Sequence, residues 1–213
     1  SKCTLVVRRE GGHLQRYVHL STGNYNSSTA KLYTDLGHLT ADAGITNDVG
    51  SLFNLLTGFN ILGSDEKGRK PSRMPEFEKI QVAPFRMRDF VIGLIESEKR
   101  LHTSENPAHI IVKMNALTDP KLVVALYKAS QKGVRIDLIV RGMCVLRPGL
   151  PGVSENIRVV SVIDRFLEHS RILWLKNGGQ PKMYLGSADF MPRNMDRRIE
   201  LLWPVEDTNL QAR

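Results

Sequence analysis

The chain has 213 residues, of which 41% are hydrophobic and 24% are charged, and these values are ordinary for a globular protein. No run of about 18 apolar residues occurs, which argues against a membrane-spanning helix. The 30 Lys and Arg residues outnumber the 22 Asp and Glu residues, giving a formal net charge of +8. This charge favours a polyanionic partner, such as nucleic acid, a phospholipid surface or a phosphate polymer, over a merely solvated basic surface.

The cysteines and the N-terminus bear on cell compartment and completeness. Cys3 and Cys144 are far apart and lack metal-ligand spacing, so we expect a reducing cytoplasm, no disulfide and no zinc site. The first ten residues, SKCTLVVRRE, lack an initiator Met and the apolar core of a signal peptide. They are typical of a strand inside a domain, so we expect the chain to be a piece of a longer protein.

The first third of the chain predicts a hairpin and a helix. Strands are expected over residues 3–9 and 14–20, joined by the turn EGGH. Apolar residues at helical spacing predict a helix over residues 45–59. The stretch 60–78 is rich in Gly, Ser, Pro and charge, and is the best candidate for a linker.

Beyond this stretch, helices and strands alternate. Helices are expected over 84–100 and 118–133, and strands over 108–114, 134–140, 157–163 and 197–205. Pro84 is expected at the start of the first helix. Asp119 is expected to cap the second helix, with Pro120 at its first position and Gly133 at its end. The alternation predicts an α/β fold with partly parallel pairing.

The two ends of the chain resemble each other. Residues 1–24, SKCTLVVRREGGHLQRYVHLSTGN, and residues 170–189, SRILWLKNGGQPKMYLGSAD, each run from Ser and a cation to a Gly-Gly turn and back to a small polar turn. Any two Gly-Gly hairpins look alike, but the matching cation and the matching polar turn are harder to explain by chance. We interpret them as an internal repeat, which predicts a pseudo-twofold architecture with two loops facing one cleft.

The second copy of the repeat carries the groups for phosphate chemistry. His169 and Arg171 precede its first strand and the turn 186–189 follows its second, so all of them should lie at one end of the hairpin. A neutral imidazole can attack phosphorus, a cation can neutralise the equatorial oxygens, and a Gly/Ser turn can cradle a phosphate. The carboxylate or amide that ends a repeated turn, Asp189 or Asn24, can orient the ring through its far nitrogen. The combination favours function over a structural role for His169.

These motifs carry a family resemblance. H-x-R at 169–171 and G-S-x-D at 186–189 are similar to the H-x-K and G-S-x-N motifs of phospholipase D-like phosphotransfer domains. More specifically, the chain resembles bacterial polyphosphate kinases over 16–42, 134–172 and 183–201. The resemblance covers nearly the whole chain except the linker.

The resemblance implies a fold and a domain division. It implies an α/β, phospholipase D-like fold of mixed sheets flanked by helices. Residues 1–60 would end one such domain, 61–80 would be a linker, and 81–213 would form the second, C-terminal domain.

The resemblance also implies an activity. Members of this family transfer the γ-phosphoryl group of ATP to a histidine and then, reversibly, to the end of inorganic polyphosphate, with Mg²⁺. The phosphorylated histidine begins an H-x-K motif, and Ser1 and Lys2 match its last two positions. The nucleophile would then precede Ser1, so this chain alone is expected to be inactive and to hold no metal site.

Individual roles follow from the same resemblance. The catalytic residues implied are His169, Lys2 and Arg171. The nucleotide- or phosphate-binding residues implied are Tyr33, Arg141, His169, Asn24, Ser187 and Asp189. Tyr33 would contact the nucleotide, Arg141 would bind phosphates, and His169 would bind nucleotide or assist proton transfer. The alternatives are that Tyr33 is a packing residue and Arg141 an ion-paired strand end.

The implied partners are ATP or ADP and inorganic polyphosphate, with no nucleic acid. The intact enzyme would be a cytoplasmic homo-oligomer, with association at the inner membrane left open. One alternative is a phospholipase D-like phosphodiesterase or nuclease, in which water accepts the intermediate. Arg171 and Asp189, in place of Lys and Asn, favour the kinase. The other alternative is a non-catalytic module that binds polyanions through charge.

A few residues stay without an assigned role. Lys113 and Asn115 end a predicted strand and could face the cleft. The cationic loop 191–198 either guides a polyanion or is simply solvated. Among the remaining histidines, only His19 lies beside one of the repeated turns.

Overall fold

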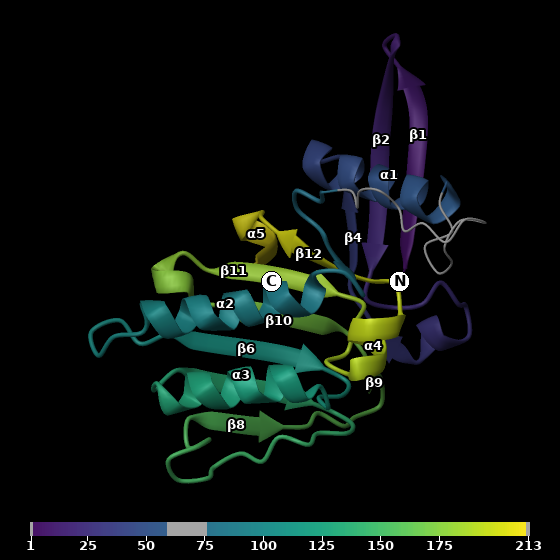
Figure 1. Ribbon diagram of the computed structural model, residues 1–213. Coiled ribbons are helices and arrows are strands. Elements are labelled where there is room, and N and C mark those ends of the chain that lie inside the picture. The colour runs from purple at the N-terminus through teal and green to yellow at the C-terminus, as the bar shows by residue number, and fades with distance from the viewer. Residues whose placement is uncertain (1, 59–75, 212–213) are drawn as a thin grey trace, which may run out of the picture. The chain divides into compact units, whose positions relative to one another are not determined.

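The computed structural model describes residues 2–58 and 76–211, which belong to two compact units. The larger unit comprises residues 1–2, 21–37 and 81–213, and the smaller comprises 3–20 and 38–80. The predicted α/β class, with mixed sheets flanked by helices, is confirmed (Figure 1). Most of the predicted linker lies outside the described residues, so the domain division stays a prediction.

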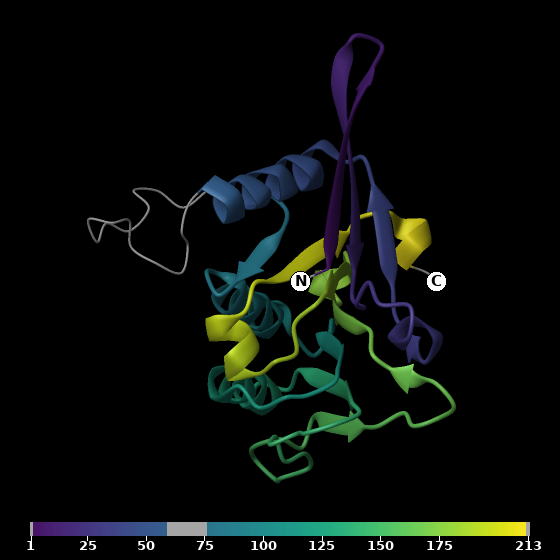
Figure 2. The ribbon, with the colours of Figure 1, turned by 90° about the vertical axis from the view of Figure 1, so that its right-hand side faces the viewer.

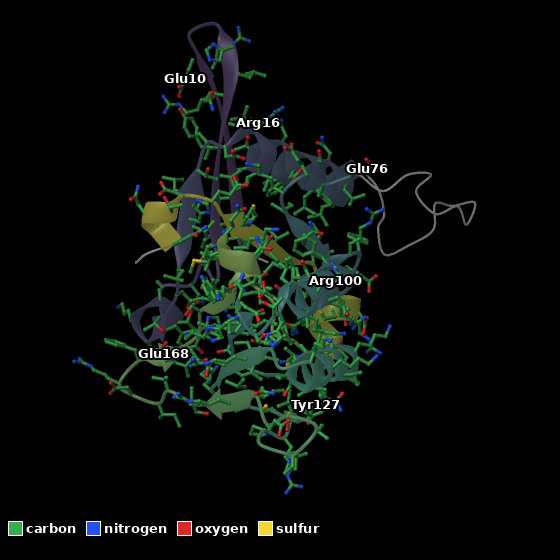
Figure 3. The ribbon with its side chains drawn as sticks, turned by 90° about the vertical axis from the view of Figure 1, so that its left-hand side faces the viewer. Glu10, Arg16, Glu76, Arg100, Tyr127 and Glu168 are labelled. Carbon is green, nitrogen blue, oxygen red and sulfur yellow. The ribbon has the colours of Figure 1, made fainter. Side chains whose placement is uncertain are left out.

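The smaller unit contains a three-stranded sheet and one helix. Its elements are β1 (Cys3–Glu10), β2 (His13–Ser21), β4 (Gly37–Thr40) and α1 (Ala43–Gly58), with sheet order β1-β2-β4. Gly11 and Gly12 join β1 to β2 with φ of 56° and 84°. A two-residue hairpin turn needs this left-handed backbone, and glycine adopts it without a Cβ clash. The predicted hairpin and helix are therefore both present, and Figure 3 labels Glu10 and Arg16 on the hairpin.

The larger unit is built on a seven-stranded mixed sheet. In spatial order its strands are β5 (Gln81–Ala83), β12 (Glu200–Val205), β11 (Lys182–Gly186), β10 (Arg171–Leu175), β6 (His109–Met114), β7 (Arg135–Val140) and β8 (Ile157–Val160). Strands β6, β7 and β8 run parallel, whereas β5, β12, β11, β10 and β6 pair antiparallel. The parallel half matches the predicted alternation of strands and helices.

Two helices cover one face of this sheet, as Figures 1 and 2 show: α2 (Met87–Leu101) and α3 (Pro120–Gln131). The core beneath them is made by alternate strand residues such as Ile110, Val112, Ile136 and Leu138, each at most 2% exposed. Burying such side chains contributes about 1.5–3 kcal/mol each. The period of two along β6 and β7 therefore fixes which face of each strand meets the helices.

The ends of the helices test the predicted signals. The Asp119 carboxylate accepts from the backbone N–H groups of Lys121 and Leu122, both at 3.1 Å, and caps α3 as predicted. Gly133 follows α3 with a φ of 96°, as predicted for the end of this helix. Pro84 is not the first residue of α2, which begins at Met87, so that prediction is wrong.

The remaining short elements are η1 (Thr29–Lys31), β3 (Tyr33–Thr34), β9 (Leu167–Glu168), η2 (Asn177–Gly179), α4 (Pro192–Arg197) and α5 (Thr208–Gln211).

The topology brings several polar chain segments to one edge of the sheet. Because β10 runs antiparallel to β6, the start of β10 lies beside the end of β6, with Ile172 opposite Lys113. The end of β11 returns to the same edge, with Gly186 opposite Arg171. The parallel pair β3–β9 adds residues around Tyr33. Within the described ranges, none of the helices has the length and apolar character needed to cross a membrane.

Candidate functional site

The two repeated hairpins match in register at the ends that carry the polar turns. In the second hairpin Arg171 pairs with Gly186, the first residue of the turn 186–189. In the first, the N–H of Ser21 donates to the carbonyl of Lys2 at 3.0 Å, and Ser21 begins the turn 21–24. Each cation therefore faces the start of its own turn, which agrees with the predicted repeat. We call 21–24 the first turn and 186–189 the second turn.

Arg171 connects the two turns. Its Nε and Nη2 donate to the two carboxylate oxygens of Asp189, at 3.2 and 3.1 Å, and both residues are only 8% exposed. Its Nη1 donates to the carbonyl of Thr22, in the first turn, at 3.1 Å and to the carbonyl of His169 at 2.7 Å. Because these donors are aimed at protein atoms, Arg171 would act on a phosphoryl group through its charge.

The His169 ring is oriented by a residue that the sequence did not reveal. Its Nδ1 lies 2.8 Å from Oδ1 of Asp35, which also accepts from the Thr22 hydroxyl at 2.7 Å. The expectation that Asp189 would orient the ring is wrong, because Asp189 is engaged by Arg171. Asp35 is 134 positions from His169 in sequence, and the short β3–β9 pairing brings it there.

Asp35 stays ionised in this arrangement. Burial opposes its charge, but the hydrogen bonds from His169 and Thr22 outweigh burial and hold the Asp35 pKa below its ordinary value. A carboxylate at Nδ1 favours the tautomer that carries a proton there. The Nε2 atom is then the acceptor nitrogen of the ring, and it lies 3.1 Å from Nη1 of Arg171.

Tyr33 packs against this ring. The two ring centroids are 4.9 Å apart and the planes are tilted by 46°. Tyr33 is half-buried in β3, one residue before Thr34 and two before Asp35. Both the predicted nucleotide contact and the alternative of a packing residue are compatible with this place.

Arg141 joins the same network through Asn115. The Arg141 Nε donates to Asn115 Oδ1 at 2.7 Å, and the Asn115 amide donates to Asp189 Oδ1 at 3.1 Å. The residues at 35, 115, 141, 169, 171 and 189 thus form one hydrogen-bonded group, which we call the His169 cluster. Burial raises the pKa of the Asp189 carboxyl, but the charge and hydrogen bonds of Arg171 and the Asn115 donors prevail and lower it.

Lys2 lies in the electrostatic field of the cluster. Burial lowers its pKa, the negative charge of Glu200 works against that, and the positive charge of Arg171 lowers it further. Asp35 and Asp189 also raise it, and the net shift is downward. Lys2, Arg141 and His169 therefore gather around one group of side chains, and Ser1 lies outside the described residues.

Two predicted phosphate-binding residues, Ser187 and Asn24, are not members of the His169 cluster. The Ser187 hydroxyl donates to Glu200 Oε2 at 2.5 Å and accepts from the N–H of Leu201 at 3.0 Å, so it is used within the sheet. Asn24 is exposed at the end of the first turn. The phosphate-binding roles of both stay predictions.

Lys113 and His19 have no predicted role, but the structure shows where each of them lies. The Lys113 ammonium donates to the Ser170 hydroxyl at 2.6 Å and pairs with Glu168 at 2.9 Å. Figure 3 shows Glu168 on the side of the larger unit opposite α2 and α3, on which Arg100 and Tyr127 are labelled. His19 is in β2, in the smaller unit.

The described residues offer no ready metal site. Across 2–58 and 76–211 there is no group of three His, Cys, Asp or Glu side chains that could hold a metal ion. The nearest carboxylates already accept hydrogen bonds, Asp35 from His169 and Thr22, and Asp189 from Arg171 and Asn115.

Two family descriptions match most of this chain. "Polyphosphate kinase C-terminal domain 2" matches residues 80–213, and "Polyphosphate kinase C-terminal domain 1" matches residues 1–61. Together they leave out only part of the predicted linker.

Similar proteins extend well beyond the length of this chain. The polyphosphate kinases of Halalkalibacterium halodurans and Pseudomonas aeruginosa are 50% and 51% identical to it over 213 residues. The chain spans 28% and 29% of their lengths. The crystal structure of a polyphosphate kinase from Porphyromonas gingivalis has a TM-score of 0.84 at 38% identity, covering 99% of this chain and 31% of that one.

Proposed function

The chain belongs to the polyphosphate kinase family, and from that premise we propose that it forms the C-terminal part of an ATP:polyphosphate phosphotransferase. The intact enzyme would move the γ-phosphoryl group of ATP to a histidine and then to the terminal oxygen of inorganic polyphosphate. Each step would be reversible. In the first, a bond from a ring nitrogen to phosphorus forms and ADP leaves; in the second, that bond breaks as the chain grows.

The observation that best supports this proposal is the bridge that Arg171 makes between the two turns beside His169. Such a bridge holds the first turn and the second turn beside His169. Phosphoryl transfer needs little covalent chemistry from a protein beyond the nucleophile, and depends on positioned charge. Lys2 and Arg171 would supply positive charge, and His169 would move a proton through Nε2 once the phosphoryl group draws Arg171 Nη1 away from that atom.

The nucleotide would lie beside Tyr33 and Arg141. A tyrosine ring offers a flat face to a base, and an arginine offers its planar fork to phosphate oxygens. Mg²⁺ would enter with the nucleotide phosphates, as the family resemblance implies. The same resemblance is the ground for expecting a cytoplasmic homo-oligomer.

The test is a phosphoenzyme assay on the longer polypeptide that contains this chain. Incubation with γ-labelled ATP should give a protein-bound phosphate that is lost in acid and kept in base, because an N–P bond has that stability. The His169→Ala variant should lose turnover about 100-fold or more, since no water can rebuild its contacts with Asp35. Label on serine, or no label on the unaltered protein, would contradict the proposal.

A second candidate function is a non-catalytic module that binds polyanions. The net charge of +8 favours it. It predicts equal, salt-dependent affinity for polyphosphate and DNA, without nucleotide binding. Binding of ATP that depends on Arg141 would exclude it.

A further inference from the structure

We propose that Asn115 is a positioning residue that fixes the Arg141 guanidinium against the buried Arg171–Asp189 pair, ready for a phosphate. The inference rests on the proposed function, which gives Arg141 a nucleotide phosphate as its ligand. This role of Asn115 could not be predicted from its residue type or from its place at the end of a strand.

The first support is the direction of the Asn115 amide. Its Oδ1 accepts from Arg141 Nε at 2.7 Å, and its Nδ2 donates to Asp189 Oδ1 at 3.1 Å. A guanidinium only donates and an ionised carboxylate only accepts, so a single orientation of the amide satisfies both neighbours. Asn115 is therefore a directional link, and an aspartate there would face Asp189 with a like charge.

The second support is the rigidity of the far end of this link. Asn115 is 7% exposed, and its own N–H donates to the same Asp189 oxygen at 2.8 Å. Asp189 is in turn held by both ends of the Arg171 fork and, through its N–H, by Oδ1 of Asn194 at 2.9 Å. Arg141 is thus anchored to a buried group that several hydrogen bonds hold in place.

The third support comes from the backbone after Arg141. The N–H of Gly142 donates to the Asn115 carbonyl at 2.9 Å. A Cβ on Gly142 would lie 2.8 Å from that same oxygen, so the chain passes over Asn115 too closely for a side chain. The Arg141–Gly142 pair therefore contacts Asn115 twice, once through the side chain and once through the backbone.

The Nη nitrogens of Arg141 are the atoms that could bind a phosphate. Arg141 is half-buried, and within the described ranges its two Nη nitrogens have no acceptor on the protein. An arginine held only by its Nε keeps the outer edge of its fork for a ligand. Fixing that fork in advance removes rotamer freedom that binding would otherwise have to remove, which strengthens binding.

The experiment measures the Kd of a non-hydrolysable ATP analogue by calorimetry, on the longer polypeptide that contains this chain. Arg141→Ala should raise the Kd about tenfold, and Asn115→Ala should raise it by a similar factor. The double variant should bind no more weakly than Arg141→Ala alone, because Asn115 acts through Arg141. Gly142→Ala, which alters no polar group, should also raise the Kd. In turnover, the KM for ATP should rise more than kcat falls.

Asn194→Ala is the matched control. Asn194 is 3% exposed and holds the same Asp189, but it has no described contact with Arg141. Both alanine variants should lower the melting temperature, whereas only Asn115→Ala should change the Kd. Equal Kd values for the two, or multiplying effects in the double variant, would overturn the inference. Failure of the proposed function would show separately, as an unaltered protein that makes no polyphosphate.

Discussion

At the scale of single residues, the pairing of His169 with Asp35 determines how the imidazole can work. The carboxylate lies 2.8 Å from Nδ1 and is kept ionised by its hydrogen bonds from His169 and Thr22. In the proposed reaction, a negative charge at Nδ1 would stabilise positive charge on the ring, as in other carboxylate–histidine pairs. An amide in the same place can accept the hydrogen bond but supplies no charge.

The Asp35→Asn variant therefore removes the negative charge beside His169 but keeps a group that can hold the ring in position. We expect kcat of the intact enzyme to fall about 10- to 100-fold, because a partner that orients a functional histidine is typically worth that much. The KM for ATP should change little, since Tyr33 and Arg141 keep their places. Thr22→Val is the control, because it removes one hydrogen bond to Asp35 and leaves the charge. If Thr22→Val lowers kcat as much as Asp35→Asn does, the charge of Asp35 is not what matters.

At the scale of elements, the sequence predicts helices and strands long enough to show a hydrophobic period or end signals, and it does not predict the two-residue strands. The helix Pro120–Gln131 was predictable because three independent signals agree: an Asp cap, a Pro at the first position and a Gly after the end. Strands β6 and β7 were predictable from their buried alternation. Strands β3 and β9 have two residues each, too few for any periodicity to register.

The same difference explains what was predicted of the site. His169, Arg171 and Asp189 lie in one hairpin, and local geometry brings them to one end of it. Asp35 reaches His169 only through the β3–β9 pairing, which no local pattern indicates. The predicted role of Asp189 is wrong because a carboxylate can pair with a cation or with a ring, and only the fold decides which is nearer.

The helix α2 contributes a buried carboxylate that should make stability depend on pH. Glu98 is 1% exposed; its Oε1 accepts from the N–H of Asn177 at 2.6 Å, and no partner for its Oε2 is found in the described part of the chain. Burial raises the Glu98 pKa, although the N–H groups of Asn177 and His109 act against that rise. Because the folded pKa is above the unfolded value of about 4.3, the stability that Glu98 contributes is present below that pH. It is lost as the pH rises through the folded pKa.

Glu98→Gln should remove this dependence. Near pH 4 the variant and the original should unfold with nearly equal free energies, and near pH 8 the variant should be more stable, by on the order of 1 kcal/mol. Glu96→Gln, on the same helix, loses only a surface ion pair with Lys99 and should change stability by less than about 1 kcal/mol at either pH. Denaturant unfolding at the two pH values measures both, and a Glu98→Gln effect independent of pH would contradict the explanation.

At the scale of the whole molecule, a net charge of +8 attracts any polyanion, so the useful question is where the charge is placed. Helix α4 begins three residues after Asp189 and carries the exposed cations Arg193 and Arg197. Helix α3 has exposed Lys128 and Lys132 at its C-terminal end. Its 12 residues place that end roughly 18 Å from its start near the second turn. This distance exceeds the Debye length of about 8 Å at physiological salt.

Two double variants with equal loss of charge should therefore behave differently. Arg193→Gln with Arg197→Gln should weaken polyphosphate binding several-fold at physiological salt, because these cations lie near the His169 cluster. Their loss should also flatten the dependence of log K on log salt by about 1–2 between about 50 and 200 mM. Lys128→Gln with Lys132→Gln should matter only at the low-salt end, where screening is weak. Equal losses from both pairs at 200 mM would mean that affinity follows total charge, as a non-catalytic polyanion-binding module requires.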